Sequence, residues 1–295
     1  MKPTLLVLAA GMGSRYGGLK QLDSFGAYGE LLIEYSIYDA IRAGFGKVVF
    51  VIRRDLEQLF YEKIGHLEQQ IHVEYVFQDT IFDLNGVHYG EHRTKPWGSA
   101  QALLAGASVI NEPFAVINSD DYYGPDAYVQ LAKFLQQDLT ENNLAMVGYV
   151  LGNTLSDHGT VNRGVCVLDE KHQLVSVEEC YAIAKNDAGK VVDKAGNELS
   201  MDTIVSMNFW GFHPNIFPAL AKEFEIFITE NKENPTVEFY LPGFVDMLLH
   251  RGSVCPVLVS KDSWCGVTYP EDKPKVAETL SGFIAEGRYP PKLRA

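Results

Sequence analysis

Residues 8–23 read LAAGMGSRYGGLKQLD and continue directly from the apolar run TLLVLA at 4–9. A glycine-rich loop therefore follows a segment that reads as a buried strand. Glycine has no side chain to obstruct an approach and permits positive φ, so backbone N–H groups in such a loop can reach phosphate oxygens. Arg15 adds a planar fork of donors and Lys20 adds a compact point charge. The stretch predicts a phosphate-binding loop at the end of a strand.

Two common phosphate-binding motifs do not fit this loop. The dinucleotide fingerprint GxGxxG begins at Gly11 and Gly13, but Tyr16 stands where its third glycine is required. The GxxxxGK[ST] motif begun at Gly13 has Leu19 at its lysine position, and the nearby Lys20 is followed by Gln21 in place of Ser or Thr. A different kind of phosphate site is required.

The composition is that of an ordinary globular protein. The chain has 295 residues, 46% of them hydrophobic, and a formal net charge of -13. This charge argues against non-specific binding to nucleic acid or to anionic lipid, which require basic surface. The four cysteines have no metal-ligand spacing, which predicts reduced, mostly buried thiols and a cytoplasmic setting. We expect no secretory leader at the start and no membrane-spanning segment.

The order of the elements predicts an α/β fold. Strand and helix patterns alternate through the first half, which indicates a parallel sheet flanked by helices. The segment LLIEYSIYDAIRAGF at 31–45 predicts a helix that Gly44 ends, and Asp55 with Gln58 predicts a capping box for the next helix. After residue 152 the segment 163–180 predicts two antiparallel strands joined by a turn.

The expected fold class is therefore mixed α/β: a mainly parallel, Rossmann-like sheet flanked by helices, with an antiparallel lobe. We expect one domain over 1–295. Its first half, 1–152, binds nucleotide, and its second half, 153–295, binds the acceptor and supplies the closing helices.

The loop resembles the signature of the sugar-1-phosphate nucleotidylyltransferases, L-A-A-G-x-G-[ST]-R followed by P-K-x-L, with Leu19 in place of the proline. The resemblance implies a GT-A-like nucleotidyltransferase fold. It also implies a Mg²⁺-dependent reaction in which a nucleoside triphosphate and a sugar 1-phosphate give an NDP-sugar and pyrophosphate. On this hypothesis Arg15 holds the β- and γ-phosphates and Lys20 reaches the α-phosphate. Such chemistry depends on positioning and charge neutralisation more than on an acid or a base.

Further segments resemble the family in the same order. The strand ending at Gln78 and the segment WGSAQALLAG at 97–106 resemble the part that holds the base and ribose, although Gln78 alone also fits a solvated strand end. The candidate nucleotide-binding residues are Leu8, Ala10, Gly11, Gly13, Ser14, Gln78, Gly98 and Ser99.

The segment VINSDDYYG at 116–124 places carboxylates directly after an apolar strand. Asp120 matches the metal-binding aspartate of the family, since Mg²⁺ favours carboxylate and phosphate oxygens, and helix capping is the alternative role. Asp120 joins Arg15 and Lys20 as the catalytic candidates. The acceptor-binding candidates, for which surface or capping roles are the alternatives, are Asp121, Glu179, Asn208 and Glu238.

Two positions depart from the family pattern. Gly266 stands where an aspartate normally completes the magnesium site. Either Asp120 holds the metal with phosphates and waters, or Asp262 or Asp272 substitutes, or catalysis is impaired. Cys180 replaces a lysine near the sugar phosphate, so another cation must serve or the substrate differs. Lys185 and Arg163 are the alternatives for that cation.

Rival functions stay open. One is a cytidylyltransferase acting on phosphocholine or another phospho-alcohol, with Trp97 or Trp210 facing the cation beside Asp121, Glu178 and Glu179. Another is a nucleotide-binding regulatory protein with impaired catalysis. A metal-dependent glycosyltransferase fits less well, because the segment SDD lacks D-x-D spacing. The expected partners are a nucleoside triphosphate and a sugar 1-phosphate, with no nucleic acid or membrane, while the base, the sugar and a homo-oligomeric state stay unassigned.

Overall fold

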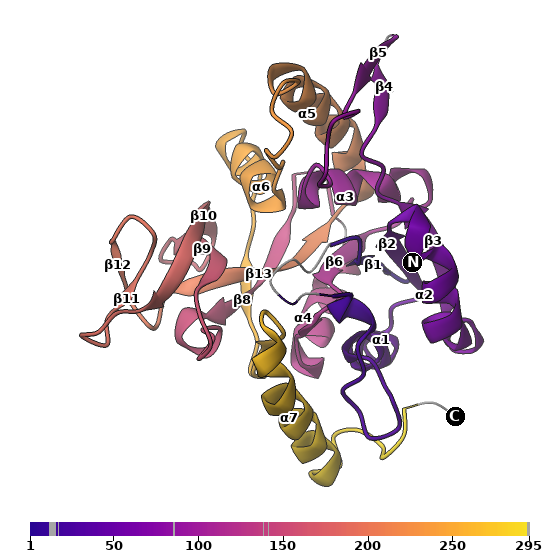
Figure 1. Cartoon of the computed structure of the whole chain (residues 1–295), viewed down its shortest axis with the longest axis vertical. Coiled ribbons are helices and arrows are strands. Elements are labelled where there is room, and N and C mark those ends of the chain that lie inside the picture. Colours follow the sequence, from indigo (N-terminus) through magenta and orange to yellow (C-terminus); the bar gives the residue numbers. More distant parts are fainter. Residues whose placement is uncertain (12–15, 17, 85, 138, 141, 294–295) are drawn as a thin grey trace.

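The computed structural model describes the chain apart from residues 12–15, 17, 85, 138, 141 and 294–295 (Figure 1). Its main sheet has the strand order β12-β11-β10-β9-β13-β6-β1-β2-β3, with β8 and β14 joined beside β13. These strands are β1 Thr4–Leu8, β2 Lys47–Ile52, β3 His72–Phe77, β6 Phe114–Asn118, β8 Ala145–Val150, β9 Val161–Leu168, β10 Leu174–Lys185, β11 Val191–Val192, β12 Glu198–Leu199, β13 Ile204–Phe212 and β14 Val257–Val259.

Two strand pairs lie outside this sheet. One is the hairpin of β4 Phe82–Leu84 with β5 Val87–Tyr89, and the other is β7 Asp121–Tyr122 paired antiparallel with β15 Cys265–Gly266. The helices are α1 Leu32–Ala43, α2 Glu57–Ile64, α3 Ser99–Ala105, α4 Pro125–Leu135, α5 Phe217–Glu230, α6 Leu241–His250 and α7 Lys273–Ala285.

Both faces of β1, β2 and β6 are buried, which explains their largely apolar sequences. In β1, Leu5 and Val7 pack in one core with α1, α2 and α4. Leu6 points to the opposite face and packs in a second core with α3, α5 and α6. All three side chains are completely buried, so truncating any of them to alanine would cost about 2–5 kcal/mol.

The helix predicted from LLIEYSIYDAIRAGF is α1, and Gly44 ends it as expected, with φ 98° and its N–H bonded to Ala40 O and Ile41 O. The capping box predicted at Asp55 is wrong. The Asp55 carboxylate instead accepts from Arg53 Nε at 3.0 Å and Nη2 at 2.6 Å. No side chain caps α2. A charge-assisted, two-pronged bond to arginine has outcompeted the capping bond.

The antiparallel half is confirmed. β9 and β10 pair across a turn in which Asp169 Oδ1 accepts from the N–H groups of Lys171 and Gln173. β13 runs antiparallel to β6, β8 and β9, so it joins the parallel strands to the antiparallel lobe in one sheet. Figure 1 shows that β9–β12 extend away from β1–β3. The mixed α/β fold class is therefore as predicted.

The C-terminal segment packs against α1 and β7. Tyr289 is buried, and its hydroxyl lies 2.6 Å from Asp39 Oδ2 and 2.8 Å from the Tyr122 hydroxyl. Burial raises the pKa of Asp39 to about 7, against the opposing effect of the Tyr289 hydrogen bond. The segment after α7 is thus tied to the strand that follows Asp120.

All four cysteines carry free thiols, as predicted. Cys166 and Cys255 are buried, and Cys180 and Cys265 are half-buried. Within the described part of the chain, no helix has the length and apolar character needed to cross a membrane.

Candidate functional site

The carboxyl ends of β6, β1, β2 and β3 lie side by side, and four of the predicted nucleotide-binding residues lie there: Leu8, Ala10, Gly11 and Gln78. Leu8 O accepts from Ser119 N at 3.1 Å, and Gln78 N donates to Ile52 O at 2.9 Å. Ala10 is buried and Gly11 is exposed, and no atom of the described residues lies within 4 Å of where a Cβ on Gly11 would stand. Ligands of open α/β sheets bind outside these strand ends, so this edge is the candidate site.

The glycine-rich loop begins here. Arg15, Gly13 and Ser14 lie outside the described residues. The start of the loop is held by Gln21, which the sequence analysis did not single out. Its buried amide nitrogen lies 3.2 Å from Ala9 O and 3.3 Å from Gly11 O. Gln21 lies thirteen residues after the end of β1, and no motif in the sequence marks it as a residue that holds the loop.

Lys20 and Asp120 form an ion pair across this edge. Lys20 Nζ also donates to Val267 O at 3.0 Å, so three distant segments meet at one ammonium group. Both side chains keep about a fifth of their surface exposed. The structure therefore brings together two of the three predicted catalytic residues, where solvent and a ligand can reach them.

Asp121 is buried behind this ion pair. Its Oδ2 accepts from Asn118 Nδ2 at 2.8 Å and lies 3.2 Å from the Tyr123 hydroxyl. Burial, followed by the charge of Asp120, raises the pKa of the Asp121 carboxyl well above its usual range. Asn118 was missed, although a polar residue closing the apolar strand at 114–117 could have indicated it.

Gly266 lies opposite Asp121 in the β7–β15 pair. A Cβ built on Gly266 would stand 2.3 Å from Asp121 Oδ1 and 2.4 Å from a ring carbon of Trp264. Asp121 therefore fills the space that a side chain at position 266 would occupy.

Asn208 on β13 reaches the Asn118 amide, which in turn bonds Asp121. Its Nδ2 lies 3.4 Å from Asn118 Oδ1, and its own side-chain oxygen is buried without a hydrogen-bond partner among the described residues. Its φ of 61° falls where β13 departs from regular pairing. An asparagine tolerates this conformation better than most residues do.

The predicted base-binding residues lie at the start of α3. Gln78 Nε2 lies 2.9 Å from Gly98 O and 2.8 Å from Gln101 Oε1. Gly98 has φ 105°, and a Cβ there would lie 2.5 Å from Phe239 O. Ser99 Oγ accepts from Leu241 N at 2.8 Å and so caps α6. Gly98 and Ser99 thus join α3 to the segment that precedes α6.

Glu179 on β10 is half-buried, and burial raises its pKa to about 7, opposed by the charge of Arg163. Arg163 on β9 is the register partner of Cys180, so their side chains share one face of the sheet. The Arg163 guanidinium donates to Thr154 O and to Asn162 O, which fixes its position.

Glu238 accepts a hydrogen bond from the Tyr240 hydroxyl. Burial is the largest cause of the raised pKa of Tyr181. The negative charges of Glu179 and Glu238 are the next largest causes. The two predicted acceptor carboxylates therefore act on the same tyrosine. Trp97 and Trp210 are completely buried, so the predicted tryptophan face for a cation is wrong. Trp97 instead packs under Arg93, whose guanidinium carbon is 3.7 Å from the ring centre.

Among the described residues, no group of three or more His, Cys, Asp or Glu side chains is placed to hold a metal ion by itself. Asp120 and Asp121 are the carboxylates at the strand ends. The fold and this edge, with its glycine-rich loop, lysine and paired aspartates, define an α/β protein that handles phosphate groups.

The chain belongs to the nucleotidyl transferase family, whose model matches residues 5–231. It is therefore a nucleotidyltransferase. No curated protein matches the chain in sequence.

Solved structures share the fold. An inositol-1-phosphate CTP transferase from T. maritima is 14% identical, with a TM-score of 0.63 and coverage of 96% of each chain. A UDP-glucose pyrophosphorylase in complex with UDP-glucose is 18% identical, with a TM-score of 0.60, covering 96% of this chain and 99% of that one. A protein from Bacillus anthracis described as a glucose-1-phosphate thymidylyltransferase is 15% identical, with a TM-score of 0.63 and coverage of 94% of each.

Proposed function

We propose that the protein transfers a nucleotidyl group from a nucleoside triphosphate to the phosphate of a sugar 1-phosphate. A phosphate oxygen of the acceptor attacks the α-phosphorus, the bond from that phosphorus to the bridging oxygen breaks, and pyrophosphate leaves. The observation that carries this proposal is the pairing of Lys20 with Asp120 at the strand ends of a nucleotidyl transferase fold. The neighbours described as UDP-glucose pyrophosphorylase and glucose-1-phosphate thymidylyltransferase support a sugar phosphate as acceptor.

Position and charge supply the catalysis. Lys20 stabilises charge on the α-phosphate as the bond to pyrophosphate breaks, and Arg15 holds the β- and γ-phosphates. Backbone groups at Ala10 and Gly11, with Gln78 and Gly98, would hold the base and ribose, and Leu8, Gly13, Ser14 and Ser99 complete the proposed nucleotide site. Fixed charges aimed at the reacting phosphoryl group need no reorganisation at the moment of reaction.

Asp120 and Asp121 would hold Mg²⁺, which supplies charge neutralisation for the crowded phosphoryl oxygens. The space at Gly266 supports this assignment, because Asp121 carries its carboxylate into the place of the missing side chain. The two alternatives are engaged elsewhere. Asp262 pairs with Arg288 at 2.9 Å and accepts from Asp126 N at 2.8 Å. Asp272 accepts from the N–H groups of Thr268 and Tyr269.

Arg163 is the cation that serves in place of the lysine missing at Cys180. It is directly opposite Cys180 in the register, and its charge acts on both Asp121 and Glu179. Lys185, the other alternative, is exposed at the end of β10, and its charge acts on Asp157 instead. Glu179, Asn208 and Glu238 would bind acceptor hydroxyls.

A phospho-alcohol acceptor is the second candidate. Tyr181 is 42% exposed beside Glu179 and Glu238, and an aromatic ring between two carboxylates suits a cationic or hydroxyl-rich alcohol. The neighbour described as an inositol-1-phosphate CTP transferase supports the wider class.

Pyrophosphate release tests the proposal. The panel combines Mg²⁺ and each of the five common triphosphates with several sugar 1-phosphates, inositol 1-phosphate and phosphocholine. Release with a sugar 1-phosphate supports the first candidate, and release with the phospho-alcohols alone favours the second. Nucleotide binding without release under any acceptor would contradict both and favour a regulatory protein that binds nucleotide.

A further inference from the structure

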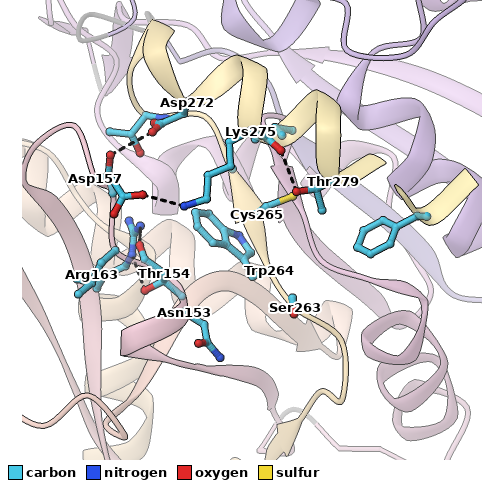
Figure 2. A pocket seen from close by; sticks show the side chains of 16 residues that line it. Asn153, Thr154, Asp157, Arg163, Ser263, Trp264, Cys265, Asp272, Lys275 and Thr279 are labelled. Atoms are coloured by element: carbon cyan, nitrogen blue, oxygen red, sulfur yellow. Dashed lines mark hydrogen bonds and ion pairs between the residues drawn. The ribbon is translucent and has the colours of Figure 1, made fainter. Parts of the chain in front are cut away.

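A cavity of about 320 Å³ lies between α7 and the turn 153–157, with β15 at its side (Figure 2). Its volume is that of a small-ligand pocket. Except for Arg163 and Gly266, its lining takes no part in the nucleotide or acceptor sites proposed above. The polar side chains that line it include Thr154, Asp157, Thr268, Asp272, Lys275 and Thr279.

The lining of the cavity has equal numbers of positive and negative side chains. Arg163 and Lys275 are positively charged, and Asp157 and Asp272 are negatively charged. Lys275 Nζ is 2.8 Å from Asp157 Oδ2, and both side chains are about three-quarters exposed. Such an exposed pair contributes little to stability, so a ligand can take hydrogen bonds from both partners at small cost. A balanced lining that offers both a donor and an acceptor suits a neutral, hydroxyl-rich ligand better than a phosphate.

Trp264 contributes an aromatic surface to the cavity. It lies among the lining residues in Figure 2 and is only 8% exposed. Its indole nitrogen has almost no accessible surface, so a ligand in the cavity meets the ring and not the N–H. Val276 and Phe283 add an apolar wall for the carbon face of a ring.

We propose that this cavity binds a neutral cyclic polyol, either a pyranose or a cyclitol ring. Ring hydroxyls accept from Lys275 and donate to Asp157, and the carbon face of the ring packs on the apolar lining. The ring lies on the α7 side of β15, so its binding is separate from catalysis at Lys20.

Thr279 and Ser281 provide a matched pair of variants for the test. Each hydroxyl donates to the carbonyl four residues earlier at 2.8 Å, but Thr279 lines the cavity while Ser281 is exposed. Titration calorimetry with glucose, myo-inositol and inorganic phosphate is carried out on the full chain and on Thr279→Phe and Ser281→Phe. We expect saturable binding of a ring by the wild type and by Ser281→Phe. Thr279→Phe should bind at least about tenfold more weakly, because the phenyl group fills the cavity.

A second pair keeps the test informative if Thr279→Phe does not fold. Lys275→Met should weaken ring binding, and Lys171→Met, at an exposed turn, should not. Three results would overturn the proposal: no ring binding by the wild type, ring binding that both cavity variants retain, or phosphate binding that the cavity variants abolish. Pyrophosphate release is measured separately, so absence of ring binding by the wild type with its turnover intact rejects only the cavity proposal.

Discussion

Asp121 and Gly266 are register partners, and the carboxylate of Asp121 occupies the space in which a Cβ on Gly266 would stand, 2.3 Å from Oδ1. The two positions therefore act as a unit. A carboxylate can be present at one of them only if the other leaves room.

Gly266→Ala tests this relationship. The added methyl group displaces Asp121 or Trp264, so we expect the free energy of unfolding to fall by about 1–3 kcal/mol, the usual cost of overpacking. We also expect a higher Mg²⁺ requirement for pyrophosphate release, because Asp121 is displaced. Denaturant unfolding and Mg²⁺ titrations measure the two effects. Gly243→Ala is the control, because nothing lies within 4 Å of a Cβ there. Wild-type behaviour of Gly266→Ala in both measurements would contradict the conclusion that Asp121 and Gly266 act as a unit.

Lys20→Ala should lower the turnover rate by about a hundredfold or more, since loss of a charge aimed at the transition state costs about 2–4 kcal/mol. The nucleotide dissociation constant should change less, because the contact strengthens only as the α-phosphate bond breaks. Single-turnover pyrophosphate release and equilibrium nucleotide binding separate the two quantities, with exposed Lys292→Ala as control. Turnover at the wild-type rate would remove Lys20 from the mechanism.

The sequence was sufficient to predict the features of the fold that depend on the order of the strands and on local residue patterns. The apolar run before the glycine-rich loop, the helix ended by Gly44, and the antiparallel pair after residue 152 all depend on residues close together in the chain. Lys20 and Asp120 lie together because both follow buried parallel strands, whose carboxyl ends share one edge.

Contacts between distant segments were not predictable from pattern. The Ser99 hydroxyl caps α6, which begins at Leu241, and only the packing of α3 against α6 brings them together. Trp97 and Trp210 were assigned to a cation site by composition, but both fill the core. Tyr289 reaches Asp39 across 250 positions of chain, and no local signal marks either residue.

Arg163→Lys tests the acceptor cation. Lysine keeps the charge but not the planar fork of donors, so we expect the acceptor KM to rise about tenfold while the triphosphate KM stays unchanged. Lys185→Met is the control and should leave both constants unchanged. Thermal unfolding of Arg163→Lys is measured alongside, because its guanidinium also fixes Thr154. Equal changes in both KM values, or an acceptor effect from Lys185→Met, would argue for a purely structural Arg163.

The buried Asp39 predicts a pH dependence of stability. Its pKa is about 7 in the folded protein, above its ordinary value near 3.8, because burial disfavours the carboxylate. Between these two values the folded state binds a proton that the unfolded state does not, so the free energy of unfolding falls as pH rises toward 7. Each pKa unit corresponds to about 1.4 kcal/mol, so the loss amounts to a few kcal/mol at most.

Asp39→Asn should remove this slope, since an amide accepts from the Tyr289 hydroxyl at every pH. Urea unfolding of both proteins from about pH 5 to about pH 8 measures the difference. The curves should converge at low pH and separate as pH rises, with the variant the more stable. Arg42, Asp262 and Arg288 also act on Asp39 through their charges. Parallel pH profiles of the two proteins would show that Asp39 is ionised in the folded state and that the Tyr289 contact does not hold a proton.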